Sequence, residues 1–107
     1  MANEELFNEL KKKGIEVALL KKDGRVINST INMSENSGSL LSSIVANAQT
    51  LGSRMHDKTK QIQIGIGDSL AIVFPFEKTI FFALTKNQDD KKLISEFAEK
   101  IRLNEDN

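Results

Sequence analysis

The sequence contains no cysteine and a single histidine, His56. Without cysteine the chain has no disulfide framework, no thiolate metal site and no cysteine nucleophile. One histidine excludes metal sites built from several histidines. His56 stands beside Asp57 near the expected end of a helix. We interpret it as a solvated or dipole-paired side chain rather than a catalytic one.

An excess of charge and long hydrophobic runs are missing as well. The chain has 15 Lys and Arg against 15 Asp and Glu in 107 residues, so neither a nucleic-acid binder nor a binder of anionic membranes is indicated. No apolar run approaches the ~18 residues of a membrane span, so we expect no direct membrane insertion. The first residues are acidic with no hydrophobic stretch behind them. We therefore expect no signal peptide and a cytoplasmic location.

The spacing of apolar residues predicts three helices and five strands. The first helix is expected to be capped by Asn3 and ended by Gly14, and the last to be capped by Asn87 or Asp89. Between them, a long helix is expected from Leu40 to about residue 57. The strands are expected at residues 15–20, 26–30, 61–66, 70–74 and 79–84. The length fits a single domain, residues 1–103, with a polar and frayed tail at residues 104–107.

Short turns between the strands, including Asp23-Gly24, predict an antiparallel sheet and the α+β class. Strands apolar on both sides should be central, which applies to residues 15–20, 70–74 and 79–84. The half-polar strands at residues 26–30 and 61–66 should be the edges. The sequence therefore predicts a five-stranded sheet in the order 2-1-5-4-3, with helices on both faces.

The long helix is unusual because residues 36–53 include no charged side chain, although 28% of the chain is charged. About five charged residues would be expected in a solvated stretch of this length. We assign its apolar stripe to the core (Leu40, Leu41, Ile44, Val45, Ala48, Leu51 and Met55). The opposite side carries small uncharged residues. Because interface cores are depleted in charge, we interpret that side as a protein interface rather than an exposed serine-rich surface.

The strand at residues 61–66 alternates strictly and contains no Lys, Glu or Pro. Such residues usually protect a sheet edge from pairing with another strand. An unprotected edge indicates that a loop covers it, or that a second copy pairs with it in a symmetric dimer. Two such edges paired antiparallel would form a ten-stranded sheet and bring the two charge-free helices together.

Motifs for catalysis or cofactor binding are not evident. Gly65-Ile66-Gly67 lacks a third glycine and a following helix, so we interpret it as a turn rather than a phosphate loop. The carboxylates form no convincing acid–base pair, and nothing distinguishes Arg54 from the other arginines. We predict no catalytic residue, no cofactor, no metal and no enzyme activity.

The chain resembles the roadblock family, the dynein light-chain roadblock type that also occurs in bacteria and archaea beside Ras-like GTPases. Residues 14–27, Gly-Ile-Glu-Val-Ala-Leu-Leu-Lys-Lys-Asp-Gly-Arg-Val-Ile, look like the first hairpin of that family. The long helix from Leu40 and residues 67–74, Gly-Asp-Ser-Leu-Ala-Ile-Val-Phe, look like its second helix and fourth strand. The resemblance covers nearly the whole chain, from Glu4 to Leu103.

The resemblance implies a roadblock/profilin-like fold and a homodimer, or a heterodimer with a paralogue, joined through the third strand and the second helix. It also implies a non-catalytic scaffold or regulator of a small Ras-like GTPase, or an adaptor in a motor or trafficking complex. Carried onto this sequence, the interface would consist of Ser42, Ser43, Ala46, Asn47, Thr50, Ser53, Gln61, Ile62, Gln63, Ile64, Gly65 and Ile66. The alternative is a small-molecule sensory domain of PAS or profilin-like architecture.

Overall fold

The computed structural model describes residues 2–31, 35–56 and 60–105 of the chain. The order of its helices and strands is the predicted one. In chain order the elements are α1 (Ala2–Lys12), β1 (Glu16–Lys21), β2 (Val26–Ser29), α2 (Glu35–Arg54), β3 (Ile62–Ile66), β4 (Ser69–Pro75), β5 (Thr79–Thr85), the short 3-10 helix η1 (Gln88–Asp90) and α3 (Lys91–Glu105).

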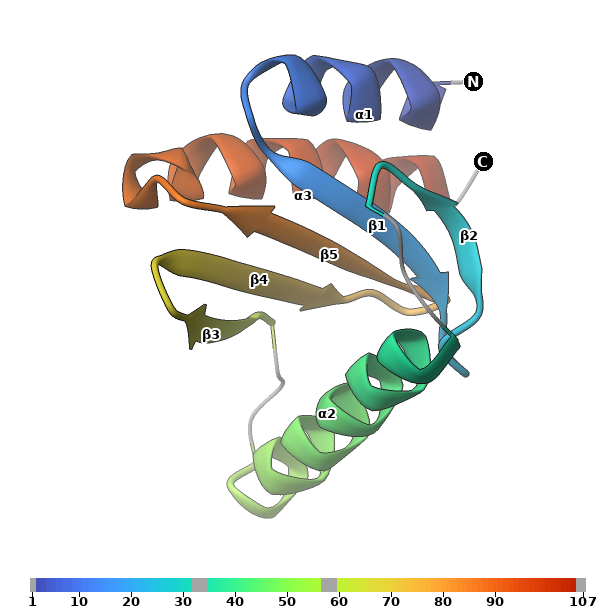
Figure 1. The fold of residues 1–107 in the computed structure, drawn as a ribbon. Helices are drawn as coiled ribbons and strands as arrows, with labels where there is room; N and C mark the ends of the chain where they lie inside the picture. The colour runs from blue at the N-terminus through green and yellow to red at the C-terminus, as the bar shows by residue number, and fades with distance from the viewer. Residues whose placement is uncertain (1, 32–34, 57–59, 106–107) are drawn as a thin grey trace.

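The five strands form one antiparallel sheet in the order β2-β1-β5-β4-β3, which confirms the predicted class and strand order (Figure 1). The central position of β1 follows from its composition, because its four residues from Val17 to Leu20 are all buried. The turn between β1 and β2 is closed by Asp23, whose Oδ1 accepts a hydrogen bond from the Arg25 backbone N–H at 3.0 Å. Gly24 in the same turn has a φ of +97°, which favours glycine.

Helices cover both faces of the sheet, as predicted: α1 and α3 lie on one face and α2 lies on the other (Figure 1). The core under α1 and α3 is the larger one and is built around Phe81, whose ring stacks on Phe74 at 5.9 Å and on Phe76 at 6.4 Å. Among the described residues, six are buried in the core under α2, namely Ala18, Leu20, Leu41, Val45, Val73 and Ile80. A single helix on this face therefore covers less of the sheet than the pair on the other.

The helix α2 begins at Glu35, five residues before the predicted start at Leu40. The polar residues ahead of Leu40 contain no proline, and Gly38 packs against Gly24 of the β1–β2 turn. This tertiary contact stabilises helix where local preference alone indicated a loop. The helix ends at Arg54, and the predicted end at residue 57 lies outside the described residues.

The last helix, α3, continues through Asn104 and Glu105, which we had expected to be a frayed tail. Glu105 accepts hydrogen bonds from the Lys78 backbone N–H at 2.8 Å and from the Thr79 hydroxyl at 2.5 Å. Asn104 donates from Nδ2 to Oδ1 of Asn3 at 2.9 Å. Asn3 was expected to cap α1 but lies inside it. These contacts hold the end of α3 against the start of α1 and the β4–β5 turn.

Candidate interaction surface

One side of α2 is apolar and exposed, which corrects the assignment of its whole apolar stripe to the core. Leu41 and Val45 are buried against the sheet, as predicted. Leu40 and Leu51 are 64% and 61% exposed, and Ile44 lies on the same side of the helix. Met55, in the turn after α2, is exposed as well. We call Leu40, Ile44, Leu51 and Met55 the exposed apolar side of α2.

The reason for this difference lies in the helix geometry. Adjacent apolar pairs, Leu40 with Leu41 and Ile44 with Val45, point about 100° apart around a helix. One member of each pair, Leu41 or Val45, packs against the sheet. Within the described part of the chain no second helix lies on this face to cover the other member (Figure 1). The sequence therefore did indicate an exposed apolar side, because the apolar stripe of α2 is too wide to be covered by the sheet alone.

The second half of this surface is β3, an edge strand that pairs with β4 on one side only within the described chain. Ile62 packs against the core under α2, so the alternation of the strand places Ile64 and Ile66 on that same face. Ile66 is 55% exposed. The edge contains no Lys, Glu or Pro, so its free backbone groups are open to another strand.

The predicted interface residues of α2 lie on more than one side of the helix. Asn47 falls between Ile44 and Leu51 at helical spacing, on the exposed apolar side. Ser43, Ala46, Thr50 and Ser53 are exposed on other parts of the helix surface. Ser42 is half-buried, and its hydroxyl donates to the backbone carbonyl of Lys22. The role of all these residues, and of residues 61–66, in an interface stays a prediction.

Three titratable side chains of the described chain have pKa values shifted by their surroundings, and each shift has a local cause. A hydrogen bond from the Arg25 backbone N–H, helped by the Arg25 guanidinium, holds the pKa of Asp23 below its ordinary value of 3.8. The Arg102 side chain likewise lowers the pKa of Glu99 by hydrogen bonding. Partial burial lowers the pKa of the Lys22 ammonium, an effect that Glu105 opposes. These are arrangements of surface pairs rather than of an acid–base site.

The fold does not bring together the residues that the sequence analysis weighed for catalysis or phosphate binding. His56 is exposed with a φ of +60° in the turn after α2, and Arg54 is exposed at the end of that helix. Gly67 has a φ of +58° and lies in the turn between β3 and β4, as predicted. Among the described residues, no three His, Asp or Glu side chains gather as a metal site would require. No helix in the part of the chain described here is long and apolar enough to cross a bilayer.

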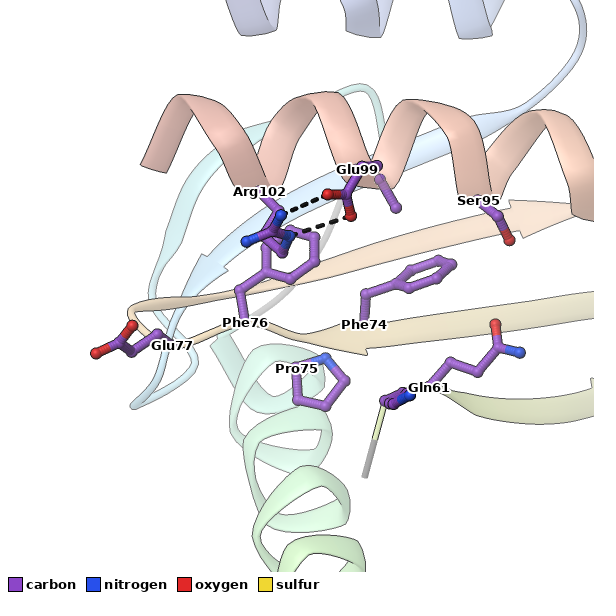
Figure 2. A pocket seen from close by; sticks show the side chains of 10 residues that line it. Gln61, Phe74, Pro75, Phe76, Glu77, Ser95, Glu99 and Arg102 are labelled. Carbon is purple, nitrogen blue, oxygen red and sulfur yellow. Dashed lines mark hydrogen bonds and ion pairs between the residues drawn. The ribbon is translucent and has the colours of Figure 1, made fainter. Parts of the chain in front are cut away.

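A groove of about 680 Å³ lies between α3 and the ends of β3 and β4 (Figure 2). Phe74 and Phe76 form its apolar part. Of its polar groups, Glu99 and Arg102 form an ion pair with each other on α3, and the Glu77 carboxylate points away from the rings (Figure 2). The groove therefore offers an apolar floor with few polar groups that converge on its interior.

Comparison with known proteins supports the fold. No protein-family model matches the sequence, and no curated protein matches it either. Among solved structures, the Roadblock/LC7 domain from Streptomyces avermitilis is similar over 95% of this chain and 96% of its own, with a TM-score of 0.77 at 16% identity. A structure described as MglB with tetrameric arrangement covers 92% of this chain and 83% of its own, with a TM-score of 0.77 at 16% identity.

Profilin IA from Acanthamoeba castellanii is also similar, over 87% of this chain and 89% of its own, with a TM-score of 0.65 at 15% identity. The resemblance noted in the sequence is thus confirmed in three dimensions. At these identities the likeness concerns the fold, not the activity or the partners. The chain has the roadblock fold, an open five-stranded sheet that it shares in outline with profilins.

Proposed function

We propose that this protein is a non-catalytic scaffold or regulator that forms a dimer and binds a small Ras-like GTPase. The observation that carries the proposal is the exposed apolar side of α2 on the same face of the sheet as the isoleucines of the unprotected β3 edge. Both features leave groups exposed that a lone domain would normally cover. The roadblock fold supports the same proposal, because the family that the sequence resembles implies this function.

The dimer in this proposal forms by two-fold symmetry at β3. Two copies of β3 paired antiparallel would satisfy each other's free backbone groups and extend the sheet to ten strands. A two-fold axis perpendicular to the sheet keeps both α2 helices on one face. Burial of each exposed leucine or isoleucine side chain would contribute at most about 1.5–3 kcal/mol before the cost of association, because these side chains are already partly buried. We propose the same chain as the second copy, and a monomeric wild type would favour a paralogue in its place.

The two α2 helices, side by side, would then present a composite surface without charged side chains from residue 36 to residue 53. Small residues such as Ser43, Ala46 and Thr50 would allow a partner backbone to approach closely. This surface is our proposed binding site for the GTPase. Regulation would act by positioning the GTPase or by changing its hydrolysis rate, with the chemistry carried by the GTPase itself.

The binding test uses purified Ras-like GTPases loaded with GDP or with a GTP analogue, passed over the immobilised protein. We expect one of them to bind, and Thr50→Lys to weaken that binding by about tenfold or more because it places a charge among the small exposed residues of the proposed GTPase surface. The control is Leu103→Lys, which places the same charge at an exposed residue of α3, the helix on the other face of the sheet. Absence of binding and of any change in GTP hydrolysis for all GTPases tested would contradict the proposal.

The alternative function, a small-molecule sensory domain, is supported by the groove in Figure 2, whose volume is in the range of ligand pockets. A ligand in that groove would raise the unfolding temperature in proportion to its concentration over its dissociation constant. Thermal stabilisation by one compound of a metabolite panel, without any GTPase binding, would favour the sensor over the scaffold.

A further inference from the structure

The start of α2 touches the β1–β2 turn so closely that neither backbone has room for a side chain. A Cβ atom on Gly24 would lie 2.5 Å from the carbonyl oxygen of Gly38, and one on Gly38 would overlap the carbonyl oxygen of Gly24. Both are well inside van der Waals contact. The two glycines therefore form a backbone-to-backbone contact that larger residues would break.

A hydrogen bond fixes the same contact one turn further along the helix. The Ser42 hydroxyl donates to the backbone carbonyl of Lys22, in the turn that contains Gly24. Ser42 is half-buried, whereas the neighbouring serines Ser39 and Ser43 are exposed. The first two turns of α2 are thus attached to the β1–β2 turn by a steric contact and by a hydrogen bond.

The remainder of α2 has much less attachment to the sheet. Val45 is the last buried residue of the helix, and no residue from Ala46 to Arg54 is buried. Leu51 lies 13 residues after Gly38, about 20 Å along the helix axis. A tilt of about 10° at Gly38 would therefore move Leu51 by about 3 Å, enough to displace a side chain from its packing position.

We propose that Gly24, Gly38 and Ser42 are positioning residues that set the angle of α2 relative to the sheet. Their consequence for assembly rests on the proposed function, because a second copy must meet α2 and the β3 edge at the same time. Leu40 and Ile44 lie about 160° around the helix from Ser42, so the exposed apolar side faces away from the β1–β2 turn. A helix at another angle would let the strands pair or the helices pack, but not both.

The test measures the helix angle directly. Because the chain contains no cysteine, Gln49→Cys on α2 and Lys92→Cys on α3 can each carry a spin label. Labelled chains are mixed with an excess of unlabelled protein, and pulsed electron resonance gives the distance distribution within one chain. We expect Gly38→Ala to shift its mean by about 3 Å or to double its width, and Ser42→Ala to broaden it. Ser39→Ala is the matched control and should leave it unchanged.

A distribution in Gly38→Ala identical to that of the wild type would overturn the proposal. Circular dichroism shows whether Gly38→Ala is folded. If it is unfolded, the distance distribution of Ser42→Ala is used instead, and a distribution identical to that of the wild type would again overturn the proposal. The second measurement is the dissociation constant for self-association, which we expect to rise about tenfold in Gly38→Ala and to stay unchanged in Ser39→Ala. A monomeric wild type with a shifted distance in Gly38→Ala would contradict the dimer but support the positioning role.

Discussion

Gly14 and Gly24 both have a φ in the left-handed region, at +82° and +97°, but only Gly24 is enclosed by other atoms. Gly14 has open space where a Cβ would project, whereas Gly24 faces the backbone of Gly38. The pair therefore separates the effect of backbone conformation from the effect of close packing.

We expect Gly14→Ala to lower the free energy of unfolding by about 1 kcal/mol, the cost of a left-handed alanine. Gly24→Ala carries the same conformational cost and a steric overlap in addition, so we expect a loss of about 3 kcal/mol or more. Urea denaturation of both variants measures the difference. Equal losses in the two variants would show that the contact between Gly24 and Gly38 contributes nothing to stability.

Asp23 makes the same turn sensitive to pH. Its pKa is lowered in the folded protein, mainly by the hydrogen bond from the Arg25 backbone N–H. A lowered folded pKa means that the carboxylate stabilises the fold above its unfolded pKa, and that this contribution is lost as pH falls through the folded pKa. We expect Asp23→Asn to be less stable than the wild type near neutral pH, with the difference shrinking below about pH 4. A difference that stays constant with pH would contradict this role.

Among the secondary-structure elements, α3 shows how one carboxylate can anchor a helix end. Glu105 binds the Lys78 backbone N–H and the Thr79 hydroxyl, whereas Glu99 on the same helix forms an exposed pair with Arg102. We expect Glu105→Ala to cost about 2 kcal/mol, since two hydrogen bonds to a charged group are lost. Glu99→Ala should cost much less than Glu105→Ala because its ion pair is exposed. Thermal unfolding of both variants tests this, and similar losses would contradict the anchor.

The element that sequence reasoning described least well is α2. Its start was predicted too late because the contact of Gly38 with Gly24 joins residues 14 positions apart. Local periodicity carries no information about such a distant contact. The prediction that its whole apolar stripe is buried was wrong, because a stripe in the sequence does not show whether the surface that packs against it lies in the same chain. Leu41 and Val45 have that partner in the sheet, but Leu40, Ile44 and Leu51 do not. Similarly, the helical state of Asn104 and Glu105 depends on residues far away in the sequence.

For the whole molecule, the strand order was predictable because each strand's composition reports how many of its faces are covered. β1, β4 and β5 are apolar on both faces, and β2 and β3 alternate or turn polar. The candidate site was predictable in part. The edge position of β3 followed from the sequence, whereas the exposed apolar side of α2 required knowing how much of the sheet one helix covers.

The central claim is that the β3 edge and the exposed apolar side of α2 join two copies of the fold. The most direct measurement is the solution mass by light scattering for the wild type, Ile64→Lys on β3 and the matched control Ile27→Lys on the other edge strand, β2. We predict twice 11.9 kDa for the wild type and the control, and 11.9 kDa for Ile64→Lys. A monomeric wild type, or an Ile64→Lys variant that stays dimeric, would contradict the account.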